Sequence, residues 1–339
     1  MLPANDTPFL LERFALFDKQ GAETLVVVLK ATFELAHDQP PTLAKQQDPL
    51  IPADVYSSGP GKSGLLAEGE LSPPKPATAI TLSAHAVPTE SNQREINVGI
   101  RVGPVSQIAV VRGNRHWDSV LGFTRMSSPE PLTRVPLTWE NAFGGADQTP
   151  ASQKDWEFQP DNHVGKGFRA KKSRRPLAGT PLPNIEHPDH PVRAPRDRPK
   201  PVGFCPVPPH WHPRVTFAGT YDERWQQERA PLLPDNFDAR FYQTAPAGLA
   251  SSTFLTGGES CVVMGTTQQR KLSFALPSVT PGFRLCWRTG ALGLQPRLDA
   301  VHVDTDRMRL HLLWRAAEEL HGKLETLQRI EAFLGPRRP

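Results

Sequence analysis

Residues 24–35 read TLVVVLKATFEL, and this stretch indicates the fold class. Its central run is apolar and β-branched, and it has the length of a strand. A strand that is apolar at consecutive positions is typically covered on both faces. We therefore expect a strand over residues 24–35 that is buried on both faces along its first half.

Outward from this strand, apolar and polar residues alternate in several further stretches, which is the pattern of half-buried strands. We predict strands at 79–87, 95–103, 107–112, 259–264, 271–276, 298–303 and 307–315. The last two are joined by Asp304-Thr305-Asp306 and are expected to pair. Alternation along 307–315 places Met308, Leu310, Leu312 and Trp314 toward the core.

Proline is unusually frequent, at 37 of 339 residues, roughly double the share in an average protein. Proline interrupts helix interiors and central strands. An all-helical protein is therefore excluded, and short strands joined by ordered loops are favoured. We predict a mainly β protein with two β-rich lobes, sandwich-like or barrel-like, with long ordered proline-rich loops and one C-terminal amphipathic helix.

The predicted helix covers residues 316–334. Leucine and alanine recur there at steps of three and four residues, at Leu313, Ala317, Leu320, Leu324, Leu327 and Leu334. Gly335 followed by Pro336 is a typical helix end. Such a stripe packs on the protein's own sheet or contacts a partner.

The pattern divides the chain into four predicted parts. They are an N-terminal β lobe (1–145), a proline-rich and basic insertion or crossing segment (146–210), a C-terminal β lobe (211–315), and the helix and tail (316–339). Regular alternation fades within 146–210, and a long irregular stretch inside a compact protein is often functional.

We expect no secretory signal in this sequence. The first residues have neither a basic nor an apolar targeting region, and no stretch approaches the ~18 apolar residues of a spanning helix. Cys205, Cys261 and Cys286 do not form a disulfide framework. We expect a cytoplasmic protein without membrane insertion.

The net charge of +4 arises from one segment. Residues 166–200 contain ten Lys and Arg and three acidic residues, a net +7, so the rest of the chain carries −3. No aromatic stacking motif lies beside this segment, so nucleic acid is not an expected partner. Its exposed cations either form a solvated loop or steer an acidic protein. The candidate partner-binding residues are Lys171, Lys172, Arg174 and Arg175.

No catalytic constellation stands out. Gly61-Lys62-Ser63 lacks the earlier glycine of a phosphate-binding loop, because that position is Tyr56. His187 and His190, and His210 and His212 near Cys205, have short spacings that zinc can use, although prolines restrict both clusters. We expect ordered loop histidines and no cofactor or metal; a metal-assisted hydrolase using these four histidines remains the alternative.

Residues 217–241 concentrate aromatic, acidic and arginine side chains. Asp222, Asp235 and Asp238 are candidates to pair with Arg224, Arg229 and Arg240, backed by Tyr221, Trp225 and Phe237. Such a latch would hold a loop without regular secondary structure.

This stretch also carries a family resemblance. Residues 219–241, GTYDERWQQERAPLLPDNFDARF, resemble the type VI secretion accessory proteins built on the domain of unknown function 2169 (DUF2169). Ten further blocks agree in order, at 5–9, 28–33, 54–56, 70–76, 111–117, 136–145, 165–168, 182–186, 257–259 and 312–315. Within these blocks the expected fold-holding residues are Lys75, Trp117, Glu186, Asp222, Trp225, Arg229, Asp235, Phe237 and Arg240.

The resemblance implies a cytoplasmic adaptor or chaperone that binds a toxic effector and helps load it onto the spike tip of a type VI secretion system. The implied partners are the effector and a spike-tip protein, and the implied role is not enzymatic. Some relatives carry pentapeptide repeats after the domain, where this chain has its predicted helix. Besides the hydrolase, a glycan-binding β module is a further alternative.

Overall fold

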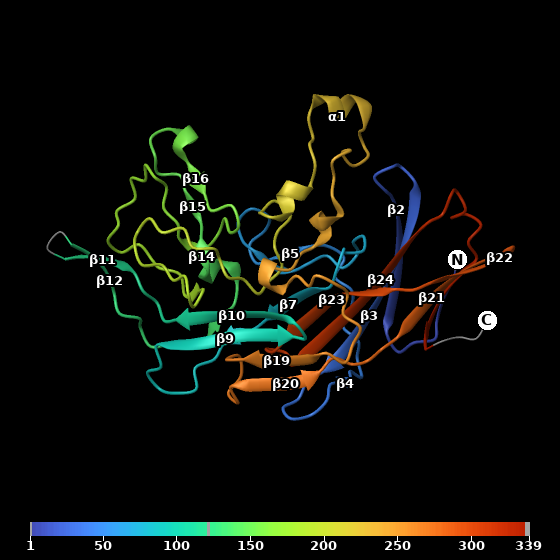
Figure 1. Cartoon of the computed structure of the whole chain (residues 1–339), viewed down its shortest axis with the longest axis horizontal. Coiled ribbons are helices and arrows are strands. Elements are labelled where there is room, and N and C mark those ends of the chain that lie inside the picture. Colours follow the sequence, from blue (N-terminus) through green and yellow to red (C-terminus); the bar gives the residue numbers. More distant parts are fainter. Residues whose placement is uncertain (1, 121–122, 336–339) are drawn as a thin grey trace.

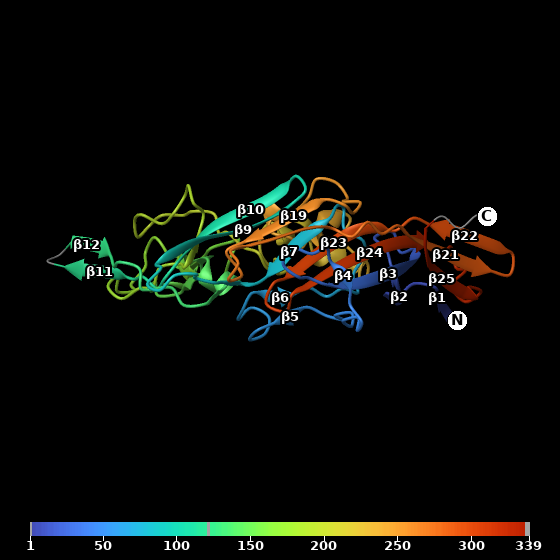
Figure 2. The ribbon, with the colours of Figure 1, turned by 90° about the horizontal axis from the view of Figure 1, so that it is seen from below.

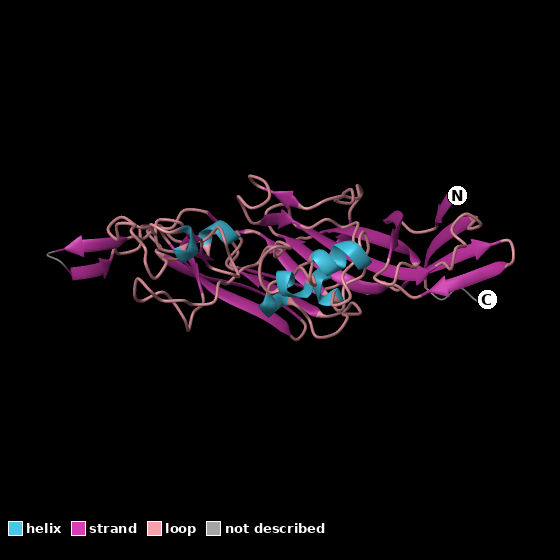
Figure 3. Ribbon diagram, turned by 90° about the horizontal axis from the view of Figure 1, so that it is seen from above, coloured by secondary structure: helices cyan, strands magenta, loops and turns pink. Residues whose placement is uncertain are grey.

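The computed structural model describes residues 2–120 and 123–335. The protein is elongated and flat (Figures 1 and 2). The hairpin of β11 (Trp117–Val120) and β12 (Phe123–Met126) lies at one end, and the hairpin of β21 (Pro281–Trp287) and β22 (Gly290–Leu294) lies at the other. Strands dominate, and short helices cluster on one side of the molecule (Figure 3). The prediction of a mainly β protein is confirmed.

The main sheet has six strands in the order β2-β3-β24-β23-β7, with β4 paired to β3. Their bounds are β2 (Leu10–Phe17), β3 (Glu23–Glu34), β4 (Thr42–Leu43), β7 (Ala79–Ser83), β23 (Arg297–Asp304) and β24 (Arg309–Glu319). β3 contains the predicted strand at 24–35 and is buried from Leu25 to Phe33, further than its first half. It lies between β2 and β24, so both of its edges are paired.

The second sheet has five strands in the order β18-β10-β9-β19-β20. Their bounds are β9 (Glu95–Val102), β10 (Val105–Arg112), β18 (Ile185–Glu186), β19 (Ser260–Met264) and β20 (Lys271–Ala275). The predicted strands at 95–103, 107–112, 259–264 and 271–276 therefore exist, and β19 pairs with β20.

A third, terminal sheet has the order β1-β25-β21-β22. Its strands are β1 (Leu2–Asn5), β21 (Pro281–Trp287), β22 (Gly290–Leu294) and β25 (Arg329–Leu334).

Short two-stranded pairs and helical turns occupy the connections. The strands are β5 (Val55–Tyr56), β6 (Leu65–Ala67), β8 (His85–Ala86), β11 (Trp117–Val120), β12 (Phe123–Met126), β13 (Val135–Pro136), β14 (Phe143–Gly144), β15 (Ala146–Asp147), β16 (Glu157–Phe158) and β17 (Lys166–Gly167). The 3₁₀ turns are η1 (Trp139–Asn141), η2 (Gln153–Asp155), η3 (Arg214–Phe217), η4 (Ala239–Tyr242) and η5 (Ala247–Leu249). Helix α1 (Glu223–Glu228) is the one α-helix of the described residues, and none of their helices is long and apolar enough to cross a membrane.

One hydrophobic core joins the three sheets. It combines Leu29 and Trp314 of the main sheet with Ile100 of the second sheet and Leu285 of the terminal sheet. Leu310, Leu312 and Trp314 are buried in it and Met308 packs against it, as the alternation predicts. The sheets pack on each other in a sandwich-like manner and remain open, with β20 and β22 at free edges.

The predicted C-terminal helix at 316–334 is wrong. β24 continues through Glu319 and pairs with β3, and the chain then turns and returns as β25 between β1 and β21. The turn begins at His321 and Gly322, which have φ angles of 48° and 73°. Pairing on both sides of β25 provides backbone hydrogen bonds and core burial that an isolated amphipathic helix lacks.

The predicted boundaries at 145 and 210 do not separate the sheets. β3 and β7 come from the N-terminal segment, yet they pair with β24 and β23. In the second sheet, β9 likewise pairs with β19. The intervening residues 146–210 form an irregular layer at one end, with a small core that contains Phe143 and Phe168 (Figure 1).

Candidate functional site

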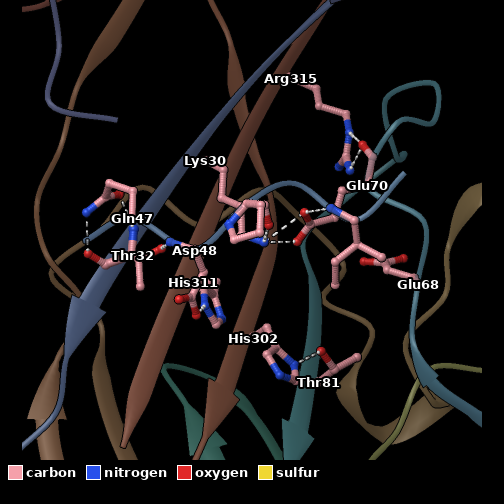
Figure 4. Close-up of polar contacts among 12 residues, drawn as sticks. Lys30, Thr32, Gln47, Asp48, Glu68, Glu70, Thr81, His302, His311 and Arg315 are labelled. Atoms are coloured by element: carbon pink, nitrogen blue, oxygen red, sulfur yellow. Dashed lines mark hydrogen bonds and ion pairs between the residues drawn. The ribbon is translucent and has the colours of Figure 1, made fainter. Parts of the chain in front are cut away.

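The face of the main sheet that turns away from the core carries a group of polar side chains beside a small apolar cluster that contains Val28 and Leu313. Alternation along each strand places Lys30 and Thr32 of β3, His311 and Arg315 of β24, and His302 of β23 on this face (Figure 4). All of these except His302, which is half-buried, are buried. Two neighbouring segments, residues 47–51 and residues 67–70, cover these side chains, and together we call them the covering loop.

Between the sheet and this loop lies a cavity of about 360 Å³. Its lining residues include Lys30, Asp48, Glu68, Glu70, Thr81, His302, Asp304, Arg307 and His311. Because it is lined by several charged and imidazole side chains, this cavity is the first candidate for chemistry.

Lys30 and Glu70 form a buried ion pair at 2.8 Å, with both side chains less than a tenth exposed. The Lys30 ammonium also donates to the Pro49 carbonyl at 2.9 Å, and the Ile51 amide donates to Glu70 at 2.7 Å. Burial raises the pKa of Glu70, and the Lys30 charge opposes that shift. These contacts attach the covering loop to β3.

A second set of buried charges lies beside the first. Arg315 contacts Asp299 at 2.5 Å and donates to the Glu70 carbonyl at 2.7 Å. Lys75 pairs with Glu68, and the Lys75 amide donates to Asp299 at 3.2 Å. Each buried cation therefore has its own carboxylate, as buried charges require.

Two histidines stack over the cavity. The rings of His302 and His311 lie 5.7 Å apart and nearly parallel. His302 hydrogen-bonds Thr81 at 2.8 Å, and His311 contacts Asp48 at 2.8 Å. Burial lowers the pKa of His302 to about 3 and that of His311 to about 4. Both imidazoles are therefore neutral at neutral pH.

This arrangement connects the sheet to its covering loop. Its ionic groups are matched within the chain, and in the described residues no group of three or more His, Cys, Asp and Glu side chains is placed to hold a metal ion. The sequence analysis did not identify this cluster. The available signal was Lys30, a single charge inside an otherwise apolar strand, which needs a buried partner.

The predicted partner-binding cations differ in their surroundings. Lys172 contacts Asp155 at 3.0 Å, and Arg175 is half-buried and donates to the Ala146 carbonyl at 3.1 Å. Lys171 and Arg174 are exposed, and their side chains have no hydrogen bond or ion pair within residues 2–120 and 123–335. The available cations of this loop are therefore Lys171 and Arg174.

The predicted latch residues lie in an arm that projects from the molecule and carries α1 (Figure 1). Asp222 caps α1 by accepting from the Trp225 amide at 2.9 Å. Arg229 pairs with Asp235 at 3.2 Å. Asp222 is thus a helix cap rather than the arginine partner that we predicted.

The rest of this arm is held by aromatic contacts. Arg240 pairs with Asp238 at 2.6 Å and lies over the Phe217 ring. Phe237 contacts Phe241, with ring centroids 5.6 Å apart. Arg224, a predicted member of the latch, instead pairs with Glu228 within α1.

Three predicted fold-holding residues are deeply buried. Lys75 is in the charged cluster described above, and Trp117 is in the small core of the irregular layer. Glu186 accepts from Arg112 at 2.7 Å and from Arg115 at 2.5 Å. Each therefore lies where its side chain connects separate segments of the chain.

The predicted histidine ligands lie in two loop settings. His187 and His190 contact each other, with ring centroids 5.1 Å apart. His210 contacts His163 and Trp211, and His212 is exposed. The sulfur of Cys205 is buried, and burial raises the pKa of its thiol to about 12, so it is not a thiolate ligand at neutral pH.

Comparison with known proteins places the chain in a family. A family model described as "Uncharacterized protein conserved in bacteria (DUF2169)" matches residues 20–315. No curated protein and no solved structure matches the chain.

Proposed function

The chain belongs to the bacterial DUF2169 family, and from this premise we propose that it is a cytoplasmic, non-enzymatic adaptor that binds a type VI secretion effector and helps load it onto the spike tip. The resemblance of its sequence blocks to type VI secretion accessory proteins supports this role.

One structural observation carries the proposal. The buried charges of the main sheet are paired within the chain, as in Lys30–Glu70 and Arg315–Asp299, whereas Lys171 and Arg174 are exposed on a loop without side-chain partners among the described residues. Matched interior charges favour a rigid scaffold, and unmatched surface cations favour an acidic protein partner. Loading would then proceed by surface complementarity.

The first test is an affinity pull-down of the tagged protein from its native cytoplasm, followed by mass spectrometry. We expect a toxin-like protein and a spike-tip protein in stoichiometric amounts. Recovery of the bait without either protein would contradict the adaptor role and would direct attention to metal and glycan ligands.

The contact surface is tested by charge reversal. We expect the combined variant Lys171→Glu and Arg174→Glu to reduce the affinity for the purified acidic partner about tenfold or more at low salt, because attraction becomes repulsion. Binding is measured by calorimetry at two salt concentrations, where the wild type weakens with salt.

A matched control makes the same charge change at the far end of the molecule. Arg288 and Lys323 are exposed near the β21–β22 hairpin. The combined variant Arg288→Glu and Lys323→Glu should bind like the wild type. If both double variants lose the same affinity for the partner, or if neither loses affinity, the basic loop is not the contact surface.

A further inference from the structure

The solvent face of the second sheet contains a groove of about 470 Å³. Register places Ile108 of β10, Gly99 of β9, Met264 of β19 and Lys271 of β20 in one row across the sheet. The neighbouring row contains Ser106, Arg101, Val262 and Ser273. The opposite face of these strands packs into the core, so this face is free of the chain's own layers.

Gly99 lies between Ile108 and Met264 at the middle of the groove, and we call the space between these two side chains the notch. A Cβ atom on Gly99 would lie 2.8 Å from the Gln107 carbonyl oxygen and 3.2 Å from Cγ1 of Ile108. Ile108 lies close over Gly99, which is itself buried, and the apolar walls of the notch are Ile108, 50% exposed, and Met264, 38% exposed. An aliphatic side chain of a partner would bury both walls.

Two cations flank the notch. Arg101 and Lys271 are exposed, and neither has an ion pair within the described residues. Strand geometry places Arg101 about 7 Å along β9 from Gly99 and Lys271 about 10 Å away across two strand spacings. The groove therefore combines an apolar notch with positive charge on two sides.

We propose that this groove is a docking site for an acidic and apolar segment of a protein partner. One aliphatic side chain of the segment occupies the notch at Gly99, and two carboxylates contact Arg101 and Lys271. Burial of the aliphatic group supplies affinity, while the paired charges select the segment and orient it. The proposal deepens the proposed function, because it specifies the chemistry of one partner contact.

The test uses the full chain and three fluorescent heptapeptides with the central triplets Asp-Leu-Glu, Lys-Leu-Lys and Asp-Ser-Glu between Gly-Ser and Ser-Gly ends. Fluorescence anisotropy at low salt should show saturable binding of the Asp-Leu-Glu peptide alone. The variant Arg101→Glu with Lys271→Glu should bind the Asp-Leu-Glu peptide about tenfold or more weakly than the wild type does, and it should bind the Lys-Leu-Lys peptide, which the wild type does not. The variant Ile108→Ser should weaken binding about threefold to tenfold by removing one apolar wall.

The double variant Arg288→Glu and Lys323→Glu, with the same charge change elsewhere, should bind like the wild type. Failure of the Asp-Leu-Glu peptide to bind, or equal binding by the Arg101 and Lys271 variant, would overturn the proposal. The wild-type chain is also tested for self-association. If it self-associates and the variant Arg101→Glu with Lys271→Glu does not, the occupant of the groove is a second copy of the chain and the proposal is overturned. The peptide experiment needs no component of a secretion system. If the groove binds the Asp-Leu-Glu peptide but the pull-down recovers no partner, only the adaptor role is refuted.

Discussion

At the scale of single residues, the buried charges of the main sheet form pairs that connect separate elements of the fold. Lys30 joins β3 to the loop at Glu70, and Arg315 joins β24 to Asp299. Removing one member of such a pair leaves an uncompensated buried charge, which is far more damaging than the loss of an exposed pair. Lys30 therefore occurs inside an apolar strand without disrupting it.

The neutral histidines His302 and His311 make stability depend on pH. Their folded pKa values, about 3 and about 4, lie below the ordinary value near 6.5. Below pH 6.5 the unfolded chain takes up protons that the folded chain does not, so the free energy of unfolding falls as the pH falls. We expect about 1.4 kcal/mol per pH unit for each histidine between pH 6 and pH 4.5, as measured by urea unfolding.

Two variants separate this contribution from that of the carboxylates. His302→Asn removes one of the titrating groups. It should reduce the slope of the free energy of unfolding against pH by the contribution of about one proton. His321→Asn changes an exposed histidine and should leave the slope unchanged. A wild-type slope equal to that of His302→Asn would show that His302 is protonated in the folded protein.

At the scale of elements, the C-terminal region shows how strand pairing overrides a local helical pattern. Ala317, on the predicted apolar stripe, is exposed on β24. Ala332, off the stripe, is fully buried in β25. The predicted helix would bury Ala317 and expose Ala332, whereas the observed strands do the opposite. The helix and the strands therefore differ in which alanine tolerates a charge.

We expect Ala332→Asp to lower the free energy of unfolding by about 3 kcal/mol or more, because it buries an unpaired carboxylate. The matched change Ala317→Asp should cost about 1 kcal/mol or less, since its side chain remains in solvent. Denaturant unfolding of both variants checks the order. A larger loss for Ala317→Asp would support the helix.

At the scale of the whole molecule, each large sheet pairs strands that are far apart in the sequence. β3 is paired along its length with β24, and their residues are far apart in the sequence. β7 pairs in parallel with β23, and β9 pairs with β19. The main and second sheets therefore each combine strands from both predicted β lobes.

This topology predicts that neither predicted lobe folds alone. A fragment of residues 1–145 and a fragment of residues 211–339 should each lack cooperative thermal unfolding and near-ultraviolet circular dichroism, because each loses half of its strand partners. The matched control is the full chain cleaved at a protease site inserted between His187 and His190, both on the surface. It should remain folded through its existing contacts, and cooperative unfolding of the isolated 1–145 fragment would contradict the shared sheets.

Most strands of the main and second sheets were predictable from the sequence, whereas no strand of the terminal sheet was predicted. Alternation along 95–103 and 271–276, and the apolar run at 24–35, depend on the period of the strand itself, which local sequence expresses directly. The proline content likewise indicated a β protein with long connections. The acidic and arginine-rich arm was found as a unit, although the role of Asp222 within it was not.

The sequence by itself thus determined the mainly β class, the positions of most strands in the main and second sheets, the basic loop and the family resemblance, because these depend on neighbouring residues. Only the tertiary structure decided that residues 316–334 form strands and a turn. It also decided that Lys30, Glu70 and Arg315 share one cluster, and that Gly99 lies between Ile108 and Met264. The physical reason is that each of these features depends on register between strands distant in the chain, which local periodicity does not encode.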